Sequence, residues 1–87
     1  MQADHEQITR LLKTARGQLD GVLRMVEDDR YCLDIVNQIM AAQAILKKAN
    51  REILRAHLAH CITDAVEAQN ANEKISEMVD LFDKMTK

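Results

Sequence analysis

The sequence predicts an all-α protein with two long helices and a short third one. The chain contains no proline and only two glycines, Gly17 and Gly21, so nothing beyond Gly21 would interrupt a helix through its backbone. Apolar residues recur at intervals of three and four along most of the chain, which is the period of an amphipathic helix. With 87 residues, the chain is expected to form one domain over residues 1–87.

The first helix is expected from about Asp4 to Glu27. Its apolar residues would form one stripe along the helix, and they are Ile8, Leu11, Leu12, Ala15, Leu19, Val22 and Val26. The polar cluster Asp28–Arg30 interrupts this pattern. We therefore expect the first turn at this cluster.

The second helix is expected from about Tyr31 to Glu67. Its apolar residues alternate spacings of four and three over three heptads, as in a bundle or a coiled coil, and they are Ile35, Ile39, Ala42, Leu46, Ala49, Ile53 and Ala56. Residues Gln69–Asn72 are polar or small and predict the second break. A short third helix from Glu73 to Lys84 would carry Ile75, Val79 and Phe82 on one side.

The composition predicts an oligomer in a reducing compartment. Hydrophobic residues make up 47% of the chain, with one Tyr, one Phe and no Trp, so a domain of this size would finish burying its apolar stripes against another subunit. The longest uncharged stretch, residues 35–46, is too short to span a bilayer, and no signal peptide is recognisable. We expect a soluble cytoplasmic protein whose two cysteines are ligands or reactive thiols rather than a disulfide.

The net charge of −2 does not by itself indicate nucleic-acid binding, but its distribution is uneven. Between residues 43 and 60 four basic residues stand against one acid, whereas residues 61–87 carry six acids and three bases. In the first helix Arg10, Lys13 and Arg16 are spaced by three. A positive surface is therefore available for nucleic acid, although charge runs of this kind more often form a solvated face that binds nothing.

The sequence shows no catalytic constellation. A Gly-rich phosphate loop, an HExxH motif and a CxxC motif are all absent from it. An enzyme is therefore not expected.

The spacing His57-x-x-x-Cys61 places an imidazole and a thiol on one face of a helix. Alone, this pair is a weak signal, because a surface imidazole beside a buried thiol would show the same spacing. Cys32 lies 25 residues before His57, and a continuous helix would separate the two by ~37 Å. In an antiparallel pair of second helices, Cys32 of one subunit could lie beside His57 and Cys61 of the other. The sequence thus predicts either an intersubunit site or no three-residue site.

Two thiolates and one imidazole form a soft ligand set of low coordination number. Copper(I) prefers such ligands, whereas zinc normally recruits a fourth ligand. Nickel and cobalt would want more nitrogen or oxygen donors. Copper(I) is therefore the metal predicted at Cys32, His57 and Cys61.

The chain resembles the copper-sensitive operon repressor (CsoR) family of bacterial repressors over nearly its whole length. The matching segments are Gly17–Gly21, Asp29–Cys32, Asn37–Ile39, Ala49–Arg51 and the His57-x-x-x-Cys61 pair. The resemblance implies a Cys-His-Cys copper site whose first cysteine comes from the opposite subunit, matched here by Cys32, His57 and Cys61. It also implies that Tyr31 and Glu77 form hydrogen bonds around the liganding histidine, in the way that outer partners orient metal-bound imidazoles.

Related sensors on the same scaffold differ at the ligand positions. By resemblance, nickel and cobalt sensors carry a histidine where this chain has Cys61, persulfide sensors lack a histidine at the position of His57, and formaldehyde sensors generally lack the last cysteine. Neither His5 nor His60 matches a ligand position of the family. The chain therefore resembles the copper sensors.

One position departs from the family pattern. Many members carry an arginine that contributes to DNA binding where this chain has Leu11, and Arg10 lies one residue earlier. Lys48 matches a basic position of the second helix. The residues expected to contact DNA are Arg10, Lys13, Arg16, Lys47, Lys48 and Arg51.

The resulting hypothesis is a homotetramer, a dimer of dimers, that represses transcription. Its metal-free form would bind operator DNA, and copper(I) would lower that affinity. One alternative is a thiol-reactive sensor in which Cys32 and Cys61 are oxidised or persulfidated. Another is a copper-binding protein without DNA binding, which the displaced Arg10 favours.

Overall fold

The computed structural model describes residues 1–85 and contains three helices, α1 (His5–Glu27), α2 (Cys32–Ala68) and α3 (Ala71–Met85). The last two residues of the predicted domain, 86 and 87, lie outside the described residues. Over the described range the chain forms helices and turns without any strand. The prediction of an all-α fold with two long helices and a short third one is confirmed.

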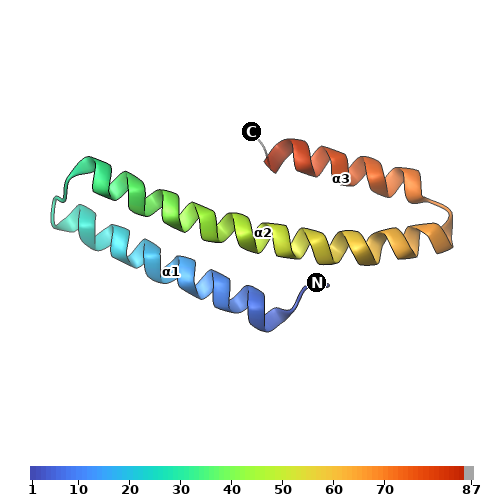
Figure 1. Ribbon diagram of the computed structural model, residues 1–87, viewed down its shortest axis with the longest axis horizontal. Coiled ribbons are helices and arrows are strands. Elements are labelled where there is room, and N and C mark those ends of the chain that lie inside the picture. The colour runs from blue at the N-terminus through green and yellow to red at the C-terminus, as the bar shows by residue number, and fades with distance from the viewer. Residues whose placement is uncertain (86–87) are drawn as a thin grey trace.

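The three helices lie side by side in one layer. α1 and α3 pack against opposite edges of α2 and, within residues 1–85, make no packing contact with each other (Figure 1). The molecule extends over 57 × 28 × 12 Å, and its shortest dimension is about the diameter of one helix. Both broad faces of the layer are therefore left without a covering helix.

The core of the layer follows a heptad pattern. Ile8, Ala15 and Val22 of α1 are spaced by seven residues and are buried. Ala42 and Ala49 of α2, also seven apart, are buried as well, and Leu54 and Met78 are buried where α3 meets α2. Small alanines at the contact allow the axes of two helices to approach closely. The heptad spacing expected for α2 is thus the spacing of its contact with α1.

Much apolar surface lies outside this core. Large side chains such as Leu12, Leu19, Ile39 and Leu46 are each at least 39% exposed. Contiguous apolar surface of this kind marks an interaction site on a soluble protein. None of the helices within residues 1–85 is both long and apolar enough to cross a bilayer.

Non-glycine residues in the left-handed region end both long helices. Asp29 has φ 53°, its N–H donates to the Val26 carbonyl at 3.1 Å, and the N–H of Arg30 donates to the Met25 carbonyl at 2.9 Å. These two bonds make a Schellman motif, which ends a helix by satisfying its last carbonyls. Asp tolerates the left-handed region better than most residues do. The predicted first turn is therefore confirmed.

The second break is shorter than the predicted Gln69–Asn72. Gln69 has φ 60°, and α3 begins at Ala71. The carbonyl of Asn70 accepts a hydrogen bond from the N–H of Lys74 at 3.4 Å, so Asn70 stands at the N-cap position. The side-chain Oδ1 of Asn70 is buried without a hydrogen-bond partner among the described residues, so the backbone bond alone marks the start of the helix. One left-handed residue followed by one N-cap residue thus suffices to reverse the chain.

The N-terminus of α1 depends on Asp4, whose Oδ1 accepts a hydrogen bond from the N–H of Glu6 at 3.1 Å. Asp4→Ala should lower the free energy of unfolding by about 1 kcal/mol, because it removes this cap and a negative charge at the positive end of the helix. Urea unfolding followed by circular dichroism, at fixed chain concentration, measures the loss. Asp4→Asn keeps the cap and should unfold close to the wild type. Equal losses in the two variants would show that the cap contributes nothing.

Candidate metal centre

The predicted ligands lie at two distant places on α2. Cys32 is the first residue of the helix and is exposed, whereas His57 and Cys61 lie one turn apart in its second half. His57 is exposed and Cys61 is half-buried, and both cysteines are free thiols. His57 and Cys61 are therefore neighbours on one helix, as their spacing predicts.

A single subunit does not bring the three residues together. α2 is continuous from Cys32 to Ala68, so the 25 residues between Cys32 and His57 correspond to ~37 Å along the axis. Among the described residues, no group of three or more His, Cys, Asp or Glu side chains could hold a metal ion. The structure confirms the unbroken helix on which the geometric prediction depends, and leaves the intersubunit site as a prediction.

The three residues nevertheless share one face of α2. At about 100° per residue, Cys32, His57 and Cys61 fall within roughly 40° of one another around the helix axis. Ile39 and Leu46 fall on the same side and are 39% and 40% exposed. This face lies between the side of α2 that α1 covers and the side that α3 covers. A second helix can therefore approach this face, and near His57 it would also meet Met1 and Met85, which line a hollow beside that residue.

Tyr31 and Glu77, the two residues expected to support the ligands, lie apart from His57 in one subunit. Tyr31 is exposed and precedes α2, and its carbonyl accepts hydrogen bonds from the N–H groups of Asp34 and Ile35 at 3.0 and 3.3 Å. Glu77 lies on α3, where its Oε2 is 3.6 Å from the Nζ of Lys74. Within residues 1–85 no hydrogen bond or ion pair joins either side chain to His57. Their roles remain predictions.

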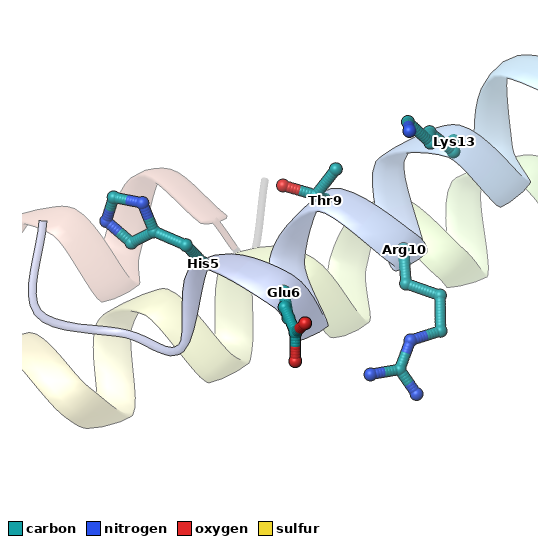
Figure 2. A pocket seen from close by; sticks show the side chains of 5 residues that line it. All are labelled: His5, Glu6, Thr9, Arg10 and Lys13. Carbon is teal, nitrogen blue, oxygen red and sulfur yellow. The ribbon is translucent and has the colours of Figure 1, made fainter.

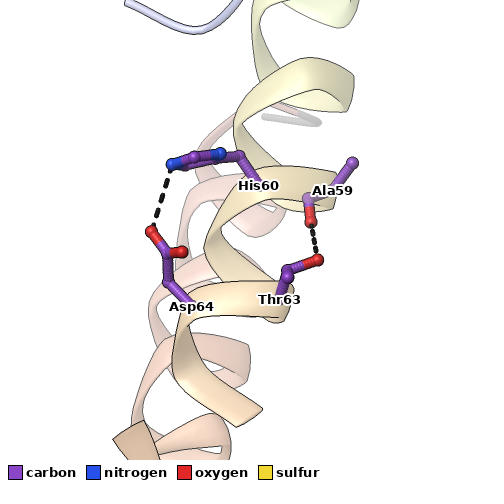
Figure 3. A network of polar contacts seen from close by, with 4 residues as sticks. All are labelled: Ala59, His60, Thr63 and Asp64. Atoms are coloured by element: carbon purple, nitrogen blue, oxygen red, sulfur yellow. Dashed lines mark hydrogen bonds and ion pairs between the residues drawn. The ribbon is translucent and has the colours of Figure 1, made fainter. Parts of the chain in front are cut away.

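His60, beside the predicted ligands, has a partner of its own. Its Nε2 is 3.1 Å from the Oδ2 of Asp64 one turn further on, and both side chains are exposed (Figure 3). On another side of the same turn, the Thr63 hydroxyl donates to the Ala59 carbonyl at 3.0 Å (Figure 3). The sequence interpretation missed the His60–Asp64 pair, although the four-residue spacing is that of helical side-chain partners.

The basic residues of α1 spread around the helix rather than forming one stripe. Arg10 and Lys13 border a shallow hollow of about 490 Å³ together with His5, Glu6 and Thr9. In Figure 2, Arg10 extends away from Thr9 and Lys13. From Arg10 to Arg16 the direction around the axis changes by about 120°. Contacts of all three with one partner would therefore require a surface that curves around α1.

The basic residues of α2 are better gathered. Lys47, Arg51 and Arg55 are spaced by four and border a groove of about 630 Å³ between α2 and α3. The groove is otherwise apolar, with Leu54, Leu58, Phe82 and Met85. Arg55 is one of the four basic residues counted between residues 43 and 60, but the sequence interpretation did not include it among the DNA contacts. Its spacing of four from Arg51 is the signal that could have added it.

Comparison with known proteins decides the family. Residues 4–84 match the family described as metal-sensitive transcriptional repressors. The chain belongs to this family. The predicted resemblance to the copper-sensitive operon repressors is thereby confirmed, and the matched proteins are transcriptional repressors rather than enzymes, as expected.

Curated relatives support the same assignment. The copper-sensing transcriptional repressor CsoR of Bacillus subtilis is 44% identical over 84 residues, which cover 97% of this chain and 83% of that protein. The CsoR protein of Mycobacterium tuberculosis is 46% identical over 69 residues, but these cover 79% of this chain and only 58% of that longer protein.

Solved structures with the same fold respond to different metals. The copper-sensing repressor CsoR of Geobacillus thermodenitrificans, solved with Cu(I), superposes with a TM-score of 0.84 at 38% identity, covering 94% of this chain and 85% of that one. The nickel-responsive regulator InrS superposes with a TM-score of 0.81 at 27% identity, covering 97% and 94%. The fold therefore does not select the metal, and the ligand residues must do so.

Proposed function

We propose that this repressor responds to copper(I). Its metal-free form binds operator DNA in the cytoplasm and releases it when copper(I) joins Cys32 of one subunit to His57 and Cys61 of another. The observation that carries the proposal is the position of these three residues on one uncovered face of an unbroken α2. The copper-sensing relatives, one of them solved with Cu(I), support the choice of metal.

The dimer follows from the positions of the ligands along α2. When two α2 helices lie antiparallel about a two-fold axis, Cys32 of each meets His57 and Cys61 of the other only if the axis passes close to Leu46, midway between them. Leu46 and Ile39 are exposed apolar residues on that face. Because α1 runs antiparallel to α2, the exposed Leu12, Leu19 and Leu23 point to the same side of the layer. The same surface thus supplies both the apolar contact and the ligands.

The donor set suits copper(I). Among the described residues, Cys32, His57 and Cys61 have no side-chain hydrogen bond or ion pair, so each is free to bind a metal. Two thiolates and an imidazole match the soft, low-coordinate preference of copper(I). Copper(I) displaces the thiol protons on binding, so copper affinity should fall as the pH is lowered.

Tyr31 and Glu77 are proposed to orient His57 in the copper-bound dimer. Glu77 would exchange its contact with Lys74 for one with the imidazole. An exposed ion pair of this kind contributes about 0.2–1 kcal/mol, so its loss is small beside the free energy of metal binding. The exchange therefore opposes copper binding only weakly.

Two further features fit a repressor that assembles as a dimer of dimers. Exposed apolar residues on the second half of α2 and on α3 offer a second contact surface. They are Ile62, Val66, Ile75, Val79 and Phe82. The proposed DNA contacts are Arg10, Lys13, Arg16, Lys47, Lys48 and Arg51, and all six side chains are exposed. Contacts of basic side chains with phosphates release counterions, so DNA binding should weaken steeply with salt.

A binding titration on a DNA fragment carrying the promoter of this protein's own gene tests the function. Metal-free protein should bind with a steep salt dependence, and one equivalent of copper(I) per chain should weaken binding by roughly 5- to 150-fold, the usual range of coupling between two ligands. Fluorescence anisotropy under anaerobic conditions measures both.

The two alternatives have distinct outcomes in the same experiment. Tight copper binding without DNA affinity at low salt would identify a copper-binding protein that is not a repressor. Release by persulfide but not by copper(I), with a sulfur-linked dimer on non-reducing electrophoresis, would identify a thiol-reactive sensor.

A further inference from the structure

A hollow of about 270 Å³ opens between α2, α3 and the first residues of the chain. Met1, Met78 and Met85 line it, and so does His57. The chain has five methionines, and the other two, Met25 and Met40, do not line this hollow. One thioether from the start of the chain and two from α3 therefore line the same hollow as the histidine that is proposed to bind copper.

The surroundings of these thioethers favour a soft cation over a hard one. The remaining residues around the hollow are Gln2, Asn50, Ile53, Leu54 and Leu81, so among the described residues no carboxylate lines it to attract Mg²⁺ or Ca²⁺. Thioether sulfur is a soft ligand that favours soft ions such as copper(I). Met78 is 8% exposed and forms the inner wall, whereas Met1 and Met85 are exposed at 61% and 37%. The two outer thioethers are accessible from solvent.

We propose that this hollow is a weak docking site for copper(I), at which Met1 and Met85 receive the ion and His57 delivers it to Cys61. The proposal rests on the proposed function, because it describes how copper reaches the Cys-His-Cys site. Each transfer exchanges one ligand for another, with copper remaining in the +1 state. A copper–thioether bond breaks as a copper–thiolate bond forms, and the thiol proton leaves to water. The thiolate, a stronger ligand than a neutral thioether, sets the direction.

The docking site can be observed with the tight site disabled. In a Cys32→Ser/Cys61→Ser variant, anaerobic addition of copper(I) should shift the methionine methyl NMR signals of Met1 and Met85 most. Met25 and Met40 serve as internal controls and should not move. Signals that all stay in place, or that all shift alike, would overturn the proposal.

A kinetic measurement tests delivery. Met85→Leu nearly preserves side-chain volume, so the fold should tolerate it. It should slow copper(I) uptake from a competing chelator by about tenfold, within the range over which association rates of related variants differ, and leave the equilibrium affinity unchanged. Met40→Leu, on α2 outside the hollow, should change neither quantity. An unchanged uptake rate in Met85→Leu, or an equal slowing in Met40→Leu, would contradict the delivery role.

A parallel copper(I) titration of the wild type separates the two proposals. If the wild type binds copper(I) tightly but the methionine signals of the double variant do not shift, the docking site is overturned and the copper-sensor proposal stands. Shifted methionine signals without tight binding by the wild type support the hollow as a copper site and overturn the sensor.

Discussion

Replacing Leu46 by lysine is expected to break the dimer formed between two α2 helices and to abolish tight copper(I) binding, although all three proposed ligands remain. Leu46 lies midway between Cys32 and the His57–Cys61 pair, so it faces its own copy across the proposed two-fold axis. Lysine there would place two positive charges against each other in an apolar interface, and an unpaired buried charge costs several kcal/mol. Sedimentation equilibrium measures the assembly, and an anaerobic chelator competition measures copper affinity.

The control for this prediction is Met40→Lys. Met40 is 58% exposed on α2 and points about 120° away from Leu46 around the helix. Both lysines are compatible with the helix itself, so a general effect of added charge would appear in both variants. Met40→Lys should assemble and bind copper like the wild type. If Leu46→Lys still formed a dimer with tightly bound copper, the proposed two-fold axis would be wrong.

The helices were predictable because the determinants are local. The absence of proline and the spacing of apolar residues define α1 and α2 almost to the residue. The second break was predicted too long, because the polar and small residues after Ala68 were all assigned to the turn. Asn70 instead stands at the N-cap position of α3 through its backbone carbonyl, and Ala71 already belongs to the helix. Only the backbone geometry distinguishes a cap from a loop residue here.

The arrangement of the helices was less accessible from the sequence. The apolar stripe predicted on α2 contains buried Ala42 and Ala49 together with exposed Ile39 and Leu46, which the heptad pattern does not separate. The structure distinguishes the side that α1 covers from the side left open. Similarly, the sequence could show that Cys32 and His57 cannot meet within a chain, but it could not show that both lie on that open side. Tertiary packing decides this.

The placement of the thioether hollow beside His57 was not predictable either. Met1 is far in the sequence from Met78 and Met85, which lie seven residues apart on α3, and only the return of α3 along α2 and the course of the N-terminal residues bring Met1 to them. The groove between α2 and α3 that Lys47, Arg51 and Arg55 border also depends on packing, because Arg55 comes from α2 and Phe82 from α3. Sites built from separate helices depend on contacts that no local pattern records.

The sharpest test of the metal centre is subunit mixing. Cys32→Ala and Cys61→Ala should each lose tight copper(I) binding, because each removes one thiolate from both sites of a dimer. When the two variants are mixed and allowed to exchange subunits, a mixed dimer keeps one site with Cys32 from one chain and His57 and Cys61 from the other. With random exchange, half of the dimers are mixed, so about one tight copper per four chains should return. An anaerobic titration of the mixture against a competing chelator measures this number.

Recovery of tight copper binding on mixing the two variants has only one geometric explanation. Each variant chain lacks one of the three ligands, so a site formed within a chain stays incomplete however the subunits are paired. Mixing Cys32→Ala with Cys32→Ala/Cys61→Ala provides the matched control, because no pairing of these two chains completes a site. Recovery in the first mixture and none in the second would establish that copper joins two subunits. No recovery in either, despite demonstrated subunit exchange, would mean that Cys32 does not share a metal with His57 and Cys61, and the thiol-reactive sensor would then be the better account of the two cysteines.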